Sequence, residues 1–295
     1  MILNFGFLAE GNTYAWRSPQ VSLASAVDHR KGEMRDQGQA WEATIDPYAR
    51  VFTTHPMTDA EQSTEWKDDP DPGYWTGEAS MPRSAQIDNT AIHLYLPAYD
   101  ETQDPVLALV FRYLDYTHAY FPQDHFDEVR QVGHWTLGAK DGGYIALWSW
   151  REPTWRVYDP AVYATNGMEQ PFDLQALGGP DNAWVVEVGT DEGGTFDEFV
   201  AAVTATEPAV ERAGDAAPGA VFKPISVSWT SPTNGDLSFG WDEPFTVDGE
   251  EQELTDFPRL DSPWGQVERL AKQYRLSAGV STLDLDFDTA TRSFD

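Results

Sequence analysis

Apolar and polar residues alternate in short runs along much of the chain, which is the pattern of half-buried antiparallel strands. Several runs are separated by Asp-Gly or Asn-Gly pairs, at residues 141–142, 234–235 and 248–249, which favour the tight turns of β-hairpins. The runs that predict strands are 21–27, 41–45, 50–54, 91–96, 107–113, 135–140, 144–150, 184–188, 225–230, 237–241 and 282–287. This pattern predicts a mainly β fold, a large antiparallel β-sandwich of the supersandwich type, with one or two short helices.

Helical periodicity is restricted to two segments. The first is Thr195–Thr206, where Thr195 is a candidate N-cap, acidic residues follow in the first turn, and apolar residues recur at helical spacing. The second, with a weaker pattern, is Trp264–Tyr274. Both are predicted to be short helices that accompany the sheets.

Two polar, Pro-containing segments, 58–73 and 206–219, predict loops. The second divides the chain into a main β-sandwich domain at 1–207, a linker or insertion at 208–219, and a C-terminal β-unit at 220–295 that we expect to pack on the main sheet. The chain enters apolar sequence directly after Met1. Such a start fits either an internal first strand or a piece of a longer protein.

The charge balance excludes one class of partner. The chain has 49 acidic and 19 basic residues, for a formal net charge of −30. A surface this acidic repels phosphate backbones, so we expect no nucleic-acid binding. The excess of carboxylates favours a salt-adapted, halophilic protein over an ordinary acidic secreted one.

The sequence also bears on compartment and redox chemistry. It contains no Cys, which excludes disulfides, thiolate catalysis and Cys-ligated metals. No run approaches the roughly 20 apolar residues that span a bilayer, so no membrane association is predicted. The first seven residues lack the basic start of a signal peptide. Localisation stays open between a salt-rich cytoplasm and an exported parent protein.

Aromatic residues are abundant, with 12 Trp, 12 Tyr and 15 Phe. Their rings stack on the apolar faces of sugars, which favours a carbohydrate partner. A large β-sandwich core also uses aromatic residues, because they are good strand formers. Both readings apply to any single Trp.

The stretch 28–43 places polar groups of both signs between two predicted strands. This mixture suits a sugar, which offers hydroxyl groups and sometimes a carboxylate. Asp28, His29 and Trp41 are therefore candidate substrate-binding residues. The alternative is a solvated hairpin loop.

The stretch 72–89 combines aromatic and polar candidates. Tyr74 and Trp75 could form a stacking platform for a sugar ring. Arg83 could pair with a uronate carboxylate through two parallel hydrogen bonds, and Gln86 could bind hydroxyl groups. The alternative is a long ordered loop that covers one face of the sandwich.

The stretch 116–129 contains the candidate catalytic residues, His118 and Tyr120. On a strand these positions point to the same side. His and Tyr can remove a proton beside a carboxylate and donate one to a leaving oxygen. His118 with His125, Asp127 or His134 could supply ligands for zinc or calcium, but no recognised metal spacing is present, so no metal site is predicted.

Three successive parts of the chain together resemble the C-terminal β-sandwich region of heparinase II/III-type proteins. They read SLASAVDHRKGE…QAWEATIDPYARVFTTHP, then PGYWTGEASMPRSAQIDN, then THAYFPQDHFDE…GHWTLGAKDGGYIAL. These proteins join an N-terminal (α/α) toroid to a β-sheet domain and act on polysaccharides, often uronate-containing ones. The resemblance covers roughly residues 21–241. The family's His-x-His element has no counterpart here, since residues 28–30 read Asp-His-Arg.

The resemblance implies the β-sandwich domain of a polysaccharide-processing protein, such as a uronate-polysaccharide lyase of heparinase II/III type. This domain would form one wall of the sugar cleft. It further implies a helical toroid encoded upstream or separately, which in this class supplies much of the catalytic Tyr/His set. Two alternatives remain open: a non-catalytic carbohydrate-binding module, and a structural domain that supports a separate catalytic toroid.

Overall fold

The computed structural model describes residues 11–33, 38–57, 78–97, 113–159, 167–212 and 222–295. About 50% of the described residues are in strands and 5% in helices, arranged in several antiparallel sheets, so the prediction of a mainly β, sandwich-like fold is confirmed. The chain divides into two compact units, residues 1–252 and 253–295.

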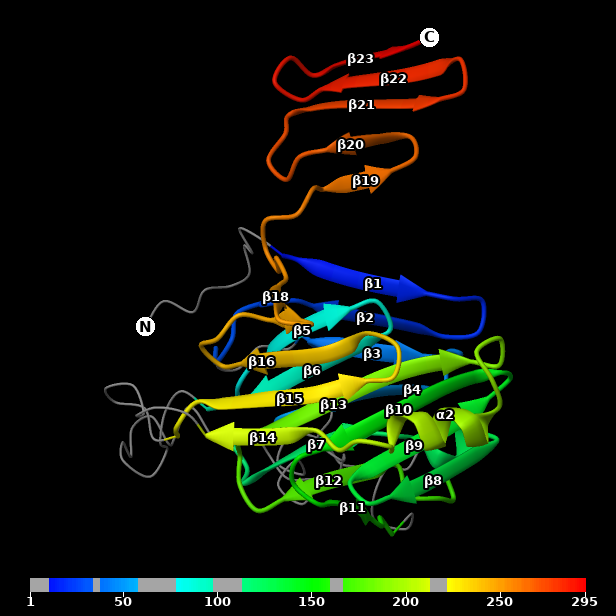
Figure 1. The fold of residues 1–295 in the computed structure, drawn as a ribbon, viewed down its shortest axis with the longest axis vertical. Helices are drawn as coiled ribbons and strands as arrows, with labels where there is room; N and C mark the ends of the chain where they lie inside the picture. The colour runs from blue at the N-terminus through cyan, green and yellow to red at the C-terminus, as the bar shows by residue number, and fades with distance from the viewer. Residues whose placement is uncertain (1–10, 34–37, 58–77, 98–112, 160–166, 213–221) are drawn as a thin grey trace. The chain divides into compact units, whose positions relative to one another are not determined.

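The first sheet has seven strands in the order β1-β2-β3-β4-β7-β12-β11 (Figure 1). Their bounds are Thr13–Arg17, Ser22–Ala26, Trp41–Thr44, Arg50–Thr54, Tyr116–Tyr120, Asp173–Leu177 and Pro153–Arg156, respectively. All the pairs are antiparallel, and the central strands β4, β7 and β12 come from three distant parts of the sequence. The centre of this sheet is therefore built by long-range pairing.

The second sheet has six strands in the order β5-β6-β13-β10-β9-β8. Their bounds are Arg83–Ile87, Thr90–Tyr95, Asn182–Thr190, Gly143–Ser149, Trp135–Lys140 and Glu128–Val132, respectively. The core lies between the two sheets, where Leu23, Val51 and Ala119 of the first pack in one cluster with Ile145 and Val186 of the second. This packing of two apolar faces is what makes the unit a sandwich.

A further layer covers the other face of the six-stranded sheet. It consists of the five-stranded sheet β14-β15-β16-β17-β18, whose yellow strands lie across the green ones in Figure 1. The bounds are Ala209–Arg212, Ile225–Ser231, Gly235–Gly240, Thr246–Val247 and Glu250–Glu251. Trp229 of β15 contacts Trp135 of β9 at 5.4 Å between ring centroids. Strand β10 is therefore buried on both faces, which explains its nearly continuous apolar sequence.

The predicted helix at 195–206 is confirmed as α2, Phe196–Val203. Thr195 caps it in a reciprocal capping box with Glu198, which satisfies two backbone N–H groups at the helix start. Phe196 and Phe199 lie 5.3 and 5.5 Å from the ring of Tyr144 on β10. The apolar face of α2 thus packs on the six-stranded sheet. No helix of the described residues is long and apolar enough to cross a membrane.

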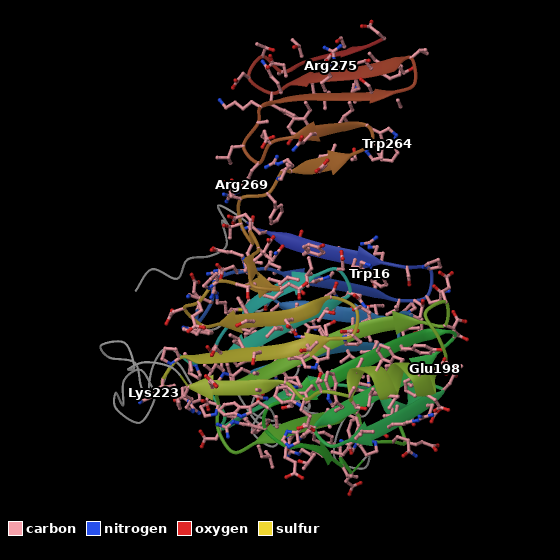
Figure 2. All side chains as sticks on the ribbon, in the orientation of Figure 1. Trp16, Glu198, Lys223, Trp264, Arg269 and Arg275 are labelled. Carbon is pink, nitrogen blue, oxygen red and sulfur yellow. The ribbon has the colours of Figure 1, made fainter. Side chains whose placement is uncertain are left out.

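The second unit contains the hairpin β19–β20 and the three-stranded sheet β21–β22–β23. The strands are Leu260–Ser262, Gly265–Val267, Gln273–Ala278, Ser281–Asp286 and Thr291–Phe294. The predicted helix at 264–274 is therefore wrong. Trp264, labelled in Figure 2, and Leu270 are 60% and 76% exposed, so a helix here has no apolar surface to pack on. Tyr274 instead pairs with Leu285 across the sheet, which a period-two strand allows.

Ten of the predicted strand runs correspond to observed strands, and those at 50–54 and 135–140 match the observed bounds. The run at 107–113 lies outside the described residues except for its last residue. Strand β14 lies inside the segment 208–219 that we predicted to be a linker. The predicted C-terminal unit at 220–295 spans strands of both compact units, because β15–β18 belong to the first.

Candidate functional site

The face of the seven-stranded sheet that points away from the inter-sheet core carries a group of polar and aromatic side chains. Register fixes this face: Ala119 of β7 and Leu174 of β12 are in the core, so their neighbours along each strand point the other way. The side chains that the register places on this face include Phe52, Thr54, Tyr116, His118, Tyr120, Thr154, Arg156, Asp173, Gln175 and Leu177. A sandwich face this rich in titratable groups is a candidate functional surface.

At the centre of this face Asp173 joins a histidine and a tyrosine. Nδ1 of His118 lies 3.0 Å from Oδ1 of Asp173, and the hydroxyl of Tyr158 donates to Oδ2 at 2.5 Å. Nε2 of Gln175 donates to the same Oδ2 at 3.3 Å. Asp173 and His118 are fully buried, and Tyr158 is nearly so. A buried carboxylate with three hydrogen-bonding neighbours is satisfied and holds those groups in fixed positions.

The electrostatics follow from this burial. Burial raises the pKa of the Tyr158 hydroxyl, and the nearby Asp173 carboxylate raises it further. Burial also raises the pKa of the Tyr120 hydroxyl, in opposition to the positive charge of Arg50. Both phenols are therefore proton donors, not phenolates, at neutral pH.

A cavity of about 360 Å³ lies beside this cluster. It is lined by Val157, Tyr158, Gly167, Met168, Glu169, Gln170, Pro171 and Phe172. Its walls are mainly apolar, with Glu169 and Gln170 as the polar groups other than the Tyr158 hydroxyl. This volume falls at the lower end of the roughly 300–1,000 Å³ that small-molecule sites occupy.

Two side chains, Asp124 and Gln123, hold the wall formed by residues 169–171 through hydrogen bonds to its backbone. The Asp124 carboxylate accepts hydrogen bonds from the backbone N–H groups of Glu169 and Gln170. Nε2 of Gln123 donates to the Pro171 carbonyl at 3.0 Å. The short helix Gln123–His125 thus anchors this wall to the loop after β7.

Aromatic rings continue from the cavity along the sheet. Tyr158 stacks on Phe172 with centroids 5.5 Å apart, and Phe172 lies 6.1 Å from Tyr120. Tyr120 in turn stacks on Phe52 at 5.3 Å. The two predicted catalytic positions therefore connect to the cavity by different routes: His118 through Asp173, and Tyr120 through Phe172.

The sequence argument missed Asp173 and Tyr158. The run 173–176, Asp-Leu-Gln-Ala, alternates polar and apolar residues, and this was the available signal for a strand with one polar face. Tyr158 follows β11 without a comparable signal. Its role depends on the pairing of β7, β12 and β11, which only the folded chain shows.

Arg83, predicted to bind a uronate, makes contacts within the protein. Its Nε donates to Asp28 at 2.9 Å, and Nη1 donates to the carbonyls of Gly240 and Glu243 at 2.5 and 2.6 Å. Its guanidinium also lies over the ring of Phe239 at 4.7 Å. These contacts join β5 to the segment after β16, so Arg83 and Asp28 connect two sheets and do not line the cavity.

The other predicted binding residues within the described part of the chain do not line the cavity. Trp41 is buried in the core, where its Nε1 donates to Thr53 at 2.7 Å and its ring stacks on His93 at 4.6 Å. Gln86 is buried and donates to the carbonyls of Leu23 and Asp88. His29 is partly exposed on the loop after β2. Tyr74 and Trp75 lie outside the described residues.

No group of three or more His, Asp or Glu side chains that could hold a metal ion occurs among the described residues. The residues considered as ligands with His118 have other contacts. His134 binds the Ser149 carbonyl through Nδ1 at 2.9 Å, and His125 packs on Tyr48. Asp127 accepts a hydrogen bond from the backbone of Asp141.

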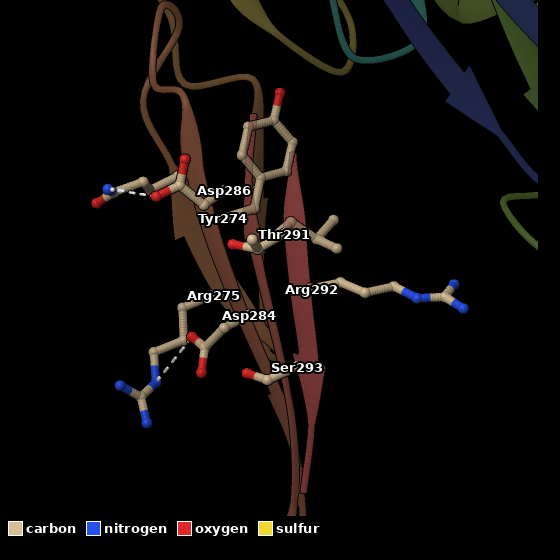
Figure 3. A pocket seen from close by; sticks show the side chains of 9 residues that line it. Tyr274, Arg275, Asp284, Asp286, Thr291, Arg292 and Ser293 are labelled. Carbon is tan, nitrogen blue, oxygen red and sulfur yellow. Dashed lines mark hydrogen bonds and ion pairs between the residues drawn. The ribbon is translucent and has the colours of Figure 1, made fainter. Parts of the chain in front are cut away.

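A second hollow of about 450 Å³ lies on the three-stranded sheet of residues 273–293 (Figure 3). Its polar side chains pair with one another: Arg275 lies 3.7 Å from Asp284, and Gln273 donates to Asp286 at 3.2 Å. The lining consists of strand side chains of a single sheet, without a buried polar group that points to a ligand. The cavity beside Tyr158 is therefore the stronger candidate.

The comparisons with protein-family models, with curated proteins and with solved structures find no match for this chain. The resemblance to heparinase II/III-type proteins thus stays a prediction from the sequence, and the site must be interpreted from its own geometry.

Proposed function

We propose that this chain is a carbohydrate-binding β-sandwich domain of a polysaccharide-processing protein, and that the cavity beside Tyr158 holds one sugar unit. The observation that carries the proposal is the cavity itself: apolar walls with a few polar groups, backed by a tyrosine that Asp173 holds in place. A helical toroid as partner domain belongs to the same proposal.

The composition of the wall suits a saccharide. A sugar ring has apolar C–H patches that pack on surfaces such as Val157, Met168 and Pro171, and hydroxyl groups that need hydrogen-bond partners. Gln170 and Glu169 supply such partners beside the apolar wall. The half-buried ring of Tyr120 extends the aromatic surface beyond the cavity, toward where an adjacent sugar of a chain would lie.

A second candidate function is an acid–base step of the lyase type, in which an acidic sugar loses a proton and the leaving oxygen gains one. The contact that favours it is the chain of hydrogen bonds from His118 through Asp173 to Tyr158, which ends at the cavity wall. In that step the Tyr158 oxygen takes the proton from the sugar while the Asp173 carboxylate accepts the hydroxyl proton of Tyr158. Tyr158 then gives its proton to the leaving oxygen as the bond to the sugar breaks and recovers a proton from Asp173, and His118 acts as a positioning residue.

The binding function is tested by isothermal titration of the whole chain with a panel of neutral, acidic and amino oligosaccharides. Val157 is 77% exposed at the cavity, so Val157→Trp can fill the entrance without disturbing the core. We expect this substitution to abolish binding. Val132→Trp is the matched control, because Val132 is 41% exposed on β8 of the six-stranded sheet and does not line the cavity.

Absence of binding by every oligosaccharide, or unchanged binding by Val157→Trp, would overturn the proposal. Formation of an unsaturated product from an acidic oligosaccharide, lost in Tyr158→Phe, would favour the lyase function over binding alone.

A further inference from the structure

The cavity beside Tyr158 has a distinct charge. Among the described residues that line it, Glu169 is the one carboxylate, and there is no Arg, Lys or His. We propose that this cavity prefers a sugar that carries an amino group and discriminates against uronates, with Glu169 as the residue that selects. This inference rests on the proposed carbohydrate-binding function and specifies its ligand class.

Glu169 is available for such a role. Its side chain is exposed, and it makes no ion pair or hydrogen bond with any described residue. Its backbone N–H is bound by the Asp124 carboxylate, which fixes the position of residue 169 in the wall. The carboxylate of Glu169 is therefore anchored at its main chain and free at its tip.

A second negative charge lies on the same wall. The Asp124 carboxylate is held against the backbone of residues 169–170, and no Lys or Arg contacts it among the described residues. The whole chain adds a net charge of −30 to this local field. Such a field attracts cations to the cavity and repels anions from it.

Arg156 lies next to Tyr158 on this face. The guanidinium of Arg156 lies over the ring of Tyr158, 4.9 Å from its centroid, and is not part of the cavity lining. Arg156 thus supports the tyrosine ring, and the lining itself offers no partner for a uronate carboxylate.

The selection follows from these charges. A uronate that enters the cavity would place its carboxylate near Glu169, and the described lining residues include no Lys, Arg or His to compensate it. Two like charges that lose water together repel each other. A protonated amine would form a charge-assisted hydrogen bond with the Glu169 carboxylate. Repulsion of one class together with attraction of another is how binding sites achieve specificity.

The test uses three disaccharides of similar size, titrated into the whole chain at 0.15 M salt: a glucosamine disaccharide, its N-acetylated form and a galacturonic acid disaccharide. We expect the glucosamine disaccharide to bind tightest and the galacturonic acid disaccharide weakest. Glu169→Gln should weaken binding of the amino disaccharide about tenfold, which corresponds to about 1.4 kcal/mol.

Glu152→Gln is the control, because Glu152 is an exposed carboxylate between β10 and β11 that lies outside the cavity lining. We expect it to leave all three affinities unchanged. Equal effects of Glu152→Gln and Glu169→Gln would show a general attraction of cations to an acidic protein and would overturn the inference.

The remaining outcomes separate the two proposals. Tighter binding of galacturonic acid than of the amino sugar would overturn the selectivity but leave the carbohydrate-binding function intact. Failure of all three disaccharides, and of the wider oligosaccharide panel, would overturn the binding function itself.

Discussion

The hydroxyl of Tyr158 donates a 2.5 Å hydrogen bond to Oδ2 of Asp173, across 15 residues of sequence that include part of the cavity lining. The same carboxylate contacts His118 through its other oxygen. The wall of the cavity is therefore tied to the middle of the seven-stranded sheet through one buried side chain.

Removal of the Tyr158 hydroxyl should destabilise the first unit. Tyr158→Phe leaves the buried Asp173 carboxylate without its closest donor, which we expect to lower the free energy of unfolding by about 1–3 kcal/mol. Urea denaturation of the variant measures the loss. Tyr48→Phe, at a ring that is 66% exposed, is the control, and a similar loss there would contradict the prediction.

Acid should destabilise the protein through its buried histidines. Complete burial lowers the pKa of His55 to about 4 and that of His93 well below its usual value. The unfolded chain then binds protons between pH 6.5 and 4 that the folded chain excludes, so stability is full above pH 6.5 and falls with pH. For His55 alone the limit is about 3 kcal/mol.

Urea denaturation at pH 7 and pH 5 measures this acid sensitivity. His55→Gln should reduce the difference between the two pH values, although it also costs stability at pH 7. His125→Gln serves as the control, since His125 is only partly buried. An unchanged difference in His55→Gln would contradict the assignment.

Glu187 should make the protein less stable at high pH, the opposite of the effect of the buried histidines. It is buried between β6 and the β15–β16 turn and accepts hydrogen bonds from Thr90, Ser231 and Thr233. Burial raises its pKa to about 7, against the effect of these hydroxyls. The folded state therefore favours the protonated form: its contribution to stability is full below pH 4.5 and is lost as pH rises through 7.

Glu187→Gln should remove this loss, raising stability at pH 8 by about 2–3 kcal/mol relative to its effect at pH 5. Denaturation at both pH values checks the prediction. The exposed Glu211 on β14 provides the matched control, Glu211→Gln. Identical effects of Glu187→Gln at the two pH values would rule out titration of this group in the folded state.

Arg83 should prove structural. Its guanidinium bridges Asp28 and two backbone carbonyls, a geometry that the single ammonium of lysine cannot reproduce. We expect Arg83→Lys to cost about 1–3 kcal/mol of stability and to leave saccharide affinity unchanged. Loss of saccharide binding at unchanged stability would restore the uronate-binding role that the sequence predicted.

Local patterns in the sequence determined the strands, their faces and the helix. Alternation over 50–54 and 135–140 placed two strands at their observed bounds, and the Thr195–Glu198 capping box lies within one helical turn. The i, i+2 spacing put His118 and Tyr120 on one face, since side chains alternate along any strand. These features depend on near neighbours in the chain, so they can be read without the fold.

Only the tertiary structure decided which residues meet. Asp173 lies 55 residues from His118 and reaches it because β12 pairs with β7, and Arg83 meets Gly240 across 157 residues. The segment 264–274 shows the same dependence, since residues 265–267 pair with 260–262 and residues 273–274 pair with 285–286 in place of the predicted helix. Which strands pair depends on the apolar surface that distant segments bury together. A local pattern of apolar and polar residues does not specify which other segment a strand will pair with.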